Sequence, residues 1–373
     1  MDVPFTYGRI AARPDFVDRE AERARLVANF GAAVNTTIIS PRRWGKSSLV
    51  AVAAQDATAA MKNLRVAQID IFGARTEAEF YAQLATGVLK ATGSRWQEWA
   101  DALRQFLAAL RPKIAISPEP MQEFSFELDW DEASRSPGEI LDLAERIATA
   151  KDLRLVVCID EFQSIADYPE TLAFQRLLRS HWQQHQHVSY CLYGSKRHML
   201  TDIFTNPAMP FYRFGDIMML AKIPNAAWAD FIVARFADTG KRISLADAGY
   251  LAALVENHSY YVQQLAQQVW FRATPEANRT IVDDALAALV DQLSLLFVAQ
   301  AESMTTRQVR LLRAVIAGEP ELSSQATLKR YDLGTSANVT RMKESLANRE
   351  VIDVSGKAIA ILDPVFVHWL RRG

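Results

Sequence analysis

A short apolar segment, Thr36–Ile39, leads directly into the octapeptide Ser40-Pro-Arg-Arg-Trp-Gly-Lys-Ser47. The segment is rich in β-branched residues, which favours a buried parallel strand, and the alanine-rich stretch from about Lys46 to Met61 is typical of a helix. A strand, a loop ending in Gly-Lys-Ser and a helix together form an arrangement that holds a chain of phosphates. The sequence therefore predicts a phosphate-binding loop at this point.

Each residue type in the loop has a chemical reason to be there. Backbone N–H groups wrap the phosphates, Gly45 permits their close approach, Lys46 contacts the outer phosphate oxygens, and the Ser47 hydroxyl binds Mg²⁺. Ser40 occupies the place of the first glycine in G-x-x-x-x-G-K-[ST], where a positive φ would strain a serine. A helix start that only happens to read Gly-Lys-Ser is the alternative. The residues expected at the nucleotide are Ser40, Pro41, Arg42, Arg43, Trp44, Gly45, Lys46, Ser47 and Ser48.

A second motif follows the apolar strand predicted at Leu153–Ile159, which ends in Asp160 and Glu161. Ligands of parallel α/β sheets bind at the carboxyl ends of the strands, so both carboxylates are expected beside the loop. We expect Asp160 to hold Mg²⁺ together with Ser47, and Glu161 to orient and deprotonate the attacking water. An N-cap for the next helix would explain one carboxylate, but not the pair after this strand. The two motifs together predict ATP or GTP binding, with ATP hydrolysis as the reaction.

Two further positions are candidate catalytic residues. Ser195 follows the predicted strand Val188–Tyr193, and at its tip it would hold the lytic water or sense the γ-phosphate, unless it only caps the next helix. Arg213 would stabilise charge across a subunit interface, which requires a homo-oligomer, and Arg179 and Arg197 compete for that role. An ordinary surface arginine is the alternative at each of these positions.

The histidines and cysteines are interpreted more plainly. His181, His185 and His187 resemble a metal cluster in their spacing, but they lack companion ligands and are expected to be solvated. Cys158 and Cys191 lie in apolar runs, which predicts buried, reduced thiols in a cytoplasmic protein.

The predicted elements change in character along the chain. Strands alternate with helices in residues 1–222, which indicates an α/β domain with a parallel sheet covered by helices and a hairpin-like insertion at about 111–132. Residues 223–302 show four helical patterns and no strand signal, which predicts an all-α lid domain. Residues 303–373 read as three helices and two short β runs, the order of a winged helix-turn-helix domain. The predicted strands are Thr36–Ile39, Leu64–Ile71, Leu153–Ile159, Val188–Tyr193 and Asp216–Leu220. Helices are predicted between them at about 77–90, 96–110, 138–150 and 170–186.

Composition limits the classes of function. With 373 residues and 50% hydrophobic residues, the chain is long and apolar enough for two or three domains. Its formal net charge of −1 argues against a protein that coats nucleic acid, although it allows a local basic patch. No apolar run reaches the ~18 residues that a membrane-spanning helix needs, so no membrane partner is expected.

The motifs together resemble the archaeal-type ATPase family, in the AAA+/STAND branch of the P-loop ATPases. The similar segments are the Pro-Arg-Arg-x-Gly-Lys-[Ser/Thr]-Ser-Leu loop, the Phe-x-x-Arg-Glu stretch at Phe16–Glu20, the Asp-Glu-Phe box at Asp160 and the C-terminal Asp-Pro-Val-Phe-x-x-Trp stretch. The resemblance implies a P-loop sheet in 5-1-4-3-2 order, with Cys158 and Cys191 on neighbouring strands. It also implies that Phe16 and Arg19 lie near the adenine.

The resemblance further implies that the lid couples the state of the nucleotide to the angle between domains. Asn257 and Ser259 replace the glycine and proline that the family usually has in this lid segment, just as Ser40 replaces the first glycine of the loop.

The use of ATP has two interpretations. One is a nucleotide-operated switch that acts on an unidentified protein partner. The other is a DNA-binding ATPase that places a recognition helix near Ser336–Leu346 in a groove of duplex DNA, with Arg341 and Lys343 toward phosphate or base. Residues 304–373 contain 11 basic and 7 acidic residues, a modest excess, and this charge balance favours the switch slightly.

Overall fold

The structure is a computed structural model, and it describes residues 3–93, 137–355 and 358–372. The predicted insertion at about 111–132 lies outside the described residues, as does the helix expected at 96–110. The chain forms two compact units. The sheet unit contains Arg19–Arg42 and Lys46–Leu220, and the helical unit contains Met1–Asp18, Arg43–Gly45 and Ala221–Gly373.

The sheet unit is built on five parallel strands in the order β2-β3-β4-β1-β5. This is the predicted 5-1-4-3-2 order seen from the other edge, so the α/β prediction is confirmed. Cys158 and Cys191 pair in register on β3 and β4, and both are buried free thiols, as expected. The strands are β1 Thr36–Ile39, β2 Leu64–Asp70, β3 Arg154–Asp160, β4 Val188–Gly194 and β5 Asp216–Met219.

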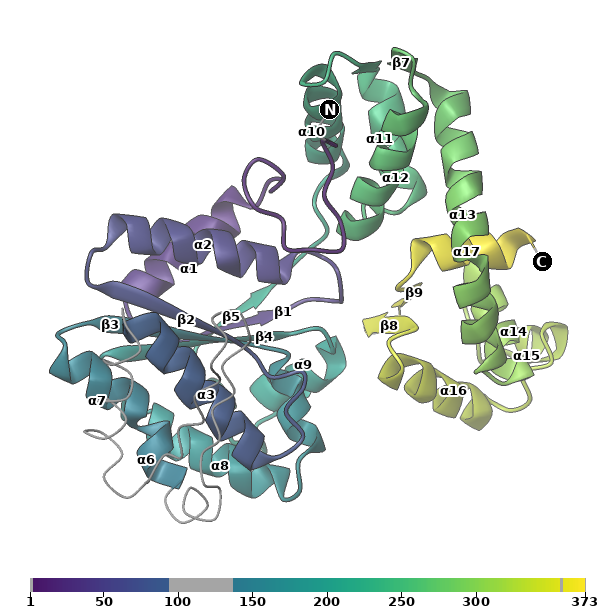
Figure 1. Ribbon diagram of the computed structural model, residues 1–373. Helices are drawn as coiled ribbons and strands as arrows, with labels where there is room; N and C mark the ends of the chain where they lie inside the picture. The colour runs from purple at the N-terminus through teal and green to yellow at the C-terminus, as the bar shows by residue number, and fades with distance from the viewer. Residues whose placement is uncertain (1–2, 94–136, 356–357, 373) are drawn as a thin grey trace, which may run out of the picture. The chain divides into compact units, whose positions relative to one another are not determined.

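Helices cover both faces of this sheet. Figure 1 shows α1 (Glu20–Gly31) and α2 (Lys46–Ala60) on one face. On the other face lie α3 (Glu77–Thr92), α6 (Pro137–Leu141), α7 (Leu143–Ala150), α8 (Thr171–Trp182) and α9 (Arg197–Thr205). Alternate strand residues pack with these helices, because successive side chains on a strand point to opposite faces. The aromatic members of that core are Phe80, Tyr81, Phe162, Tyr168, Phe174, Trp182, Tyr190, Phe204, Phe211 and Phe214.

Two predicted helices have different bounds in the structure. The helix expected at Gly138–Ala150 is divided into α6 and α7 at Asp142. The helix expected at Glu170–Gln186 ends at Trp182, and a carboxylate of α7 accepts the N–H groups of residues 186–188. A side chain from another helix therefore supplies the partners that further helical turns would have supplied.

The helical unit begins with four helices: α10 (Asn225–Ala237), α11 (Leu245–Leu254), α12 (Ser259–Arg272) and α13 (Arg279–Glu302). The expectation of no strand in this region was wrong, because β6 (Arg242–Ile243) pairs in parallel with β7 (Glu276–Ala277). Each strand has only two residues, which is too short to show an alternating pattern.

The remaining elements are α14 (Thr306–Ile316), α15 (Gln325–Arg330), α16 (Ser336–Asn348), the antiparallel pair β8 (Ile352–Ser355) and β9 (Ala358–Ile361), and α17 (Pro364–Arg372). This is the predicted order of helices and wing. Thr305 starts α14 with a capping box that includes Gln308.

One hydrophobic core runs through the helical unit, from Phe5 and Trp228 to Phe297 and Phe366. Polar contacts follow the same path, since His368 Nε2 lies 2.7 Å from the Leu254 carbonyl oxygen and Trp369 donates to the Ser294 hydroxyl. The four helices after Ala221 and the winged-helix elements are therefore packed as one body. None of the described helices combines the length and the apolar character that crossing a bilayer requires.

Candidate functional site

The loop between β1 and α2 has the backbone that a phosphate cradle requires. Arg43 and Gly45 adopt positive φ values of 63° and 93°. At Gly45 the φ alone favours glycine, since a Cβ atom there would meet nothing within 4 Å. Ser40 is not among the residues with positive φ, and its buried hydroxyl donates to the Pro41 carbonyl oxygen at 3.0 Å. The missing first glycine therefore causes no strain in this chain.

Lys46 and Ser47, the first residues of α2, lie against the carboxyl end of β3. The Ser47 hydroxyl donates to Asp160 Oδ2 at 2.6 Å. Lys46 Nζ lies 4.0 Å from Asp160 Oδ1 and 3.5 Å from Glu161 Oε1. Residues that are 113 and 115 positions apart in the sequence are thus brought together, as the two motifs predicted.

A change of backbone conformation lets both carboxylates face the lysine. Consecutive side chains on a strand point to opposite faces, but Glu161 leaves β3 in the left-handed region, with a φ of 55°. Its N–H donates to Asp160 Oδ1 at 2.8 Å. The short 3₁₀ helix η1 (Phe162–Asp167) follows directly. A left-handed residue other than glycine is costly, and such residues cluster at functional sites.

The two carboxyl groups differ in protonation behaviour. Burial raises the pKa of Asp160 by more than Lys46 and the Ser47 hydroxyl lower it. Burial also acts on Glu161, but there the charge of Lys46 and hydrogen bonds from Gln163 and Ser195 outweigh it and lower the pKa. Glu161 is therefore held as a carboxylate, the form that accepts a proton.

Ser195 and Gln163 complete the surroundings of Glu161. The Ser195 hydroxyl, 4% exposed, donates to Glu161 Oε2 at 3.1 Å, so the candidate serine does reach the acid pair. The Gln163 amide donates to the same oxygen. Sequence reasoning missed Gln163, although a glutamine directly after an Asp-Glu-Phe triplet was a visible signal.

The donor set fits a nucleotide with a divalent cation. A hydroxyl and a carboxylate oxygen 2.6 Å apart are hard oxygen ligands of the kind that Mg²⁺ takes. The lysine beside them makes only long contacts, and it lies at the start of a helix, where the backbone N–H groups favour an anion. This arrangement is suited to phosphoryl transfer to water.

Comparisons with known proteins agree with this geometry. The chain is similar to the solved structure of a Walker-type ATPase of Pyrococcus abyssi, with a TM-score of 0.67 and 18% identity over 99% of both chains. It is also similar to the ORC2 protein of Aeropyrum pernix in ADPNP–ADP complexes, with a TM-score of 0.60 and 14% identity over 99% of this chain and 98% of that chain. The fold is that of the P-loop ATPases. No curated protein matches the sequence.

A family model matches the C-terminal part of the chain, and a third solved structure is similar over nearly the whole chain. A family model for a probable winged helix domain matches residues 296–372. The ORC1 protein of Aeropyrum pernix, solved in complex with DNA, is similar with a TM-score of 0.50 and 13% identity over 96% of this chain and 95% of that chain. The predicted winged helix is confirmed.

The arginines considered for charge stabilisation lie in the sheet unit. Arg213 is exposed, with a φ of 54°, and its guanidinium lies 5.2 Å from the centre of the Tyr212 ring. Arg179 is half-buried over Phe214, and Arg197 is half-buried at the start of α9. Their proposed catalytic roles stay predictions.

The residues expected near the adenine belong to different units. Arg19 is buried in the sheet unit, where it precedes α1 and donates to Glu22 Oε1 at 2.9 Å. Phe16 is half-buried in the helical unit. Within the helical unit, Arg43 lies over the Tyr260 ring at 4.6 Å. Asn257, in place of the family's glycine, has a φ of 55°, a conformation that asparagine tolerates well.

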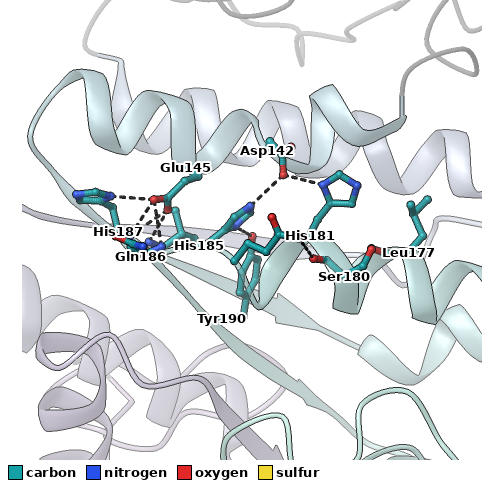
Figure 2. Close-up of polar contacts among 11 residues, drawn as sticks. Asp142, Glu145, Leu177, Ser180, His181, His185, Gln186, His187 and Tyr190 are labelled. Atoms are coloured by element: carbon teal, nitrogen blue, oxygen red, sulfur yellow. Dashed lines mark hydrogen bonds and ion pairs between the residues drawn. The ribbon is translucent and has the colours of Figure 1, made fainter.

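The expectation of solvated histidines was wrong. His181 Nδ1 and His185 Nε2 lie 2.8 and 3.1 Å from Asp142 Oδ1, and the His185 side chain is only 4% exposed. His187 Nδ1 lies 2.8 Å from Glu145 Oε1. Figure 2 shows Asp142 pointing between two of the rings and Glu145 toward the third. The acidic partners are Glu145 of α7 and Asp142 directly before it, about 40 positions earlier in the sequence, so the histidine spacing alone did not reveal them.

The histidine cluster forms pairs and not a metal cage. Across the described ranges, no group of three or more His, Cys, Asp or Glu side chains is arranged to hold a metal ion. Because a carboxylate only accepts hydrogen bonds, His185 donates through Nε2, and its Nδ1 lies 2.9 Å from the Tyr190 hydroxyl oxygen. The cluster joins α7 to the end of α8 and the start of β4.

Proposed function

We propose that this chain is an ATP-binding, Mg²⁺-dependent ATPase of the AAA+/STAND type, which uses hydrolysis to drive a conformational switch on a protein partner. The observation that carries the proposal is the meeting of Lys46 and Ser47 with Asp160 and Glu161 at the carboxyl end of β3. Each side chain has the chemistry that phosphoryl transfer to water requires.

The roles of the residues follow from their contacts. Lys46 exchanges its long contacts with the carboxylates for the phosphate oxygens of ATP, which pair with it more closely. Ser47 and Asp160 would hold Mg²⁺, which neutralises charge on the phosphates when it is bound. Glu161 accepts the proton of the attacking water, and Ser195 holds the carboxylate that does so. The residues proposed to line the nucleotide are Ser40–Ser48, Phe16 and Arg19.

The helical unit supports the switch. We propose a lid at 223–302 and a winged-helix domain at 303–373, following an ATPase domain at 1–222. Their common core means that a change in the lid would move the winged helix with it. We also propose a cytoplasmic location, which the two free, buried thiols support.

Charges on the winged helix support a protein partner. Arg310 pairs with Asp332, Arg330 with Glu319, and Arg372 with Asp291 of α13. A positive patch for DNA needs cations that are not already neutralised by neighbouring carboxylates. Each of these pairings leaves one cation fewer to contact a DNA phosphate.

DNA binding is the second candidate function, and one observation favours it. Helix α16 presents an exposed face that includes Ser336, Thr340 and Arg341, with Lys343 half-buried beside it. Small polar and basic side chains on a winged-helix recognition helix are suited to contacts with phosphates and base edges.

The first experiment tests ATP. Purified chain is titrated with ATP, with and without Mg²⁺, and the release of ADP and phosphate is followed. We expect binding that Mg²⁺ strengthens and release of one phosphate per ADP. Absence of binding at millimolar ATP would contradict the proposal.

The second experiment separates the two candidate uses of ATP. Anisotropy of labelled duplex DNA is measured with the full-length chain at salt concentrations from about 50 to about 200 mM, where phosphate contacts weaken steeply. We expect weak binding that Arg341→Ala does not change. Tight, salt-dependent binding that Arg341→Ala weakens would favour the DNA-binding ATPase.

Arg213 requires its own test, because its role depends on assembly. If it acts across a subunit interface, turnover per chain rises with protein concentration and Arg213→Ala abolishes that rise. A wild-type rate that is independent of concentration would argue against an interface role.

A further inference from the structure

Gln163 is a buried residue whose amide forms a hydrogen bond with Glu161. Its side chain is 2% exposed, and its Nε2 donates to Glu161 Oε2. The assignment of the amide is fixed by chemistry, because a carboxylate oxygen only accepts hydrogen bonds. The other end of the amide, Oε1, is buried and has no hydrogen-bond partner among the described residues.

The contact with Glu161 fixes the position of this amide. Because the other end of the amide has no partner among the described residues, no second hydrogen bond there competes with Glu161 for the orientation of the side chain. An unpartnered oxygen is not itself a mark of function, since Gln175 has one as well. What distinguishes Gln163 is its contact with the proposed base.

Gly194 makes room for this contact. A Cβ atom added at Gly194 would lie 1.8 Å from Gln163 Oε1 and 2.9 Å from its Cδ. Gly194 lies in β4 and has no positive φ, so space and not backbone conformation explains the glycine. The residue directly before Ser195 thus clears the path by which the amide reaches Glu161.

The two oxygens of Glu161 have different partners. Oε2 accepts hydrogen bonds from both Gln163 and Ser195, whereas the partner of Oε1 among the described residues is Lys46, at 3.5 Å. When Lys46 turns to the phosphates of ATP, Oε1 loses its partner and Oε2 keeps two. The carboxylate then stays in place, with one oxygen left to accept a proton.

We propose that Gln163 is a positioning residue, which together with Ser195 holds Glu161 Oε2 so that Oε1 is the atom that takes the proton of the attacking water. The inference rests on the proposed function. In that step the water oxygen forms a bond to the γ-phosphorus, and the bond from this phosphorus to the bridging oxygen breaks. The proton moves to Oε1, and ADP leaves with the bonding electron pair.

The main test replaces the amide and keeps the volume. In Gln163→Met we expect kcat to fall by about 10- to 100-fold, as a small displacement of a reacting group does, while the Kd for ATP changes less than about twofold. Gln175→Met is the matched control: Gln175 is also fully buried, also has an unpartnered Oε1, and contacts Thr171 instead of the acid pair. The Gln175→Met variant should have the same kcat as the wild type. An unchanged kcat in Gln163→Met would overturn the proposal.

Gly194→Ala tests the same contact from the other side and serves if Gln163→Met does not fold. The added methyl displaces the amide, so kcat should fall as in the glutamine variant. In a Gln163→Ala background the clash with the amide is absent and a contact of 3.3 Å with Glu161 Cα remains, so Gly194→Ala should cost much less than it does in the wild type. Additive losses in the double variant would show that Gly194 acts on Glu161 without Gln163, which would overturn the proposal.

A readout without nucleotide separates this inference from the proposed function. Urea unfolding of the ligand-free chain is measured for Gln163→Met, Glu161→Leu and the double variant. We expect the two changes to be strongly non-additive, because they remove the same contact. If the wild type hydrolyses no ATP, the ATPase proposal fails. The comparison of the two single variants with the double variant still tests whether Gln163 and Glu161 interact. Additivity here would overturn the inference even in an active ATPase.

Discussion

Two clusters of acids and bases lie in the sheet unit, and they differ in how closely their acidic and basic groups approach each other. At the amino end of β4, histidines approach Asp142 and Glu145 at 2.8–3.1 Å. At the carboxyl end of β3, Lys46 stays 3.5 and 4.0 Å from its two carboxylates. The first cluster is held by hydrogen bonds of normal length, whereas the second keeps a cation whose three N–H donors are poorly matched.

The difference separates a structural network from a binding site. Glu145 accepts N–H groups from the backbone of residues 186–188 in addition to His187, so its oxygens are fully used. A polar network with every member satisfied holds elements together. A buried lysine with only long contacts is ready to exchange them for a better anion, and ATP phosphates are such an anion.

The largest expected effect comes from a substitution in the cluster of Lys46, Asp160 and Glu161. Glu161→Gln removes the proton acceptor but keeps the size of the side chain, so turnover should fall by about 10²- to 10⁴-fold. ATP affinity should be nearly unchanged, as measured by titration of the purified variant. Glu170→Gln, at an exposed position, is the control. Unchanged turnover in Glu161→Gln would point to another base.

The next effect concerns binding at the same cluster. Lys46→Ala removes the cation that contacts the phosphates, and ATP affinity should fall at least about 100-fold, equivalent to about 2.7 kcal/mol. Isothermal titration calorimetry measures it, with the exposed Lys90→Ala as the control. Retained affinity would mean that the loop is not the cradle.

At the histidine cluster the expected effect is on the stability of the fold. Asp142→Ala leaves the buried His185 without its acceptor, so the free energy of unfolding should fall by about 2 kcal/mol. Urea denaturation measures the loss. ATP affinity and turnover should not change, and a loss of either would show that the two clusters are coupled.

The smallest expected effect is a dependence on pH of the difference in stability between the wild type and Asp142→Asn. Burial opposes ionisation of Asp142, but hydrogen bonds and charge from His181 and His185 prevail and lower its pKa. A lowered folded-state pKa gives stability that is present above the unfolded value of about 4 and is lost as the pH falls through the folded value. Asp142→Asn lacks this contribution. The wild-type advantage, about 0.5 kcal/mol after allowance for partial exposure, should therefore shrink below about pH 5. A difference in unfolding free energy between the two proteins that stays constant from pH 7 to pH 3 would contradict this prediction.

The sequence predicted the sheet and the main site because both depend on local patterns. Each strand is an apolar run, and Lys46, Ser47, Asp160 and Glu161 follow such runs at positions that parallel topology brings to one edge. The histidine cluster could not be predicted in this way, since its acids belong to a distant helix. Gln163 was missed because its contact depends on space beside Gly194, which no spacing in the sequence expresses.

The single core of the helical unit has a consequence for how such proteins diversify. Winged helices are usually exchanged between proteins as independent modules, each with its own interior. Here Phe297 of α13 packs against Phe366 of α17, with ring centroids 5.4 Å apart, and Arg372 pairs with Asp291. Recombination that replaced only the C-terminal helices would leave α13 with bare apolar surface. Inheritance of a new DNA or protein specificity therefore has to proceed by substitutions on the outer face of α16, or by transfer of everything after Ala221 as one piece.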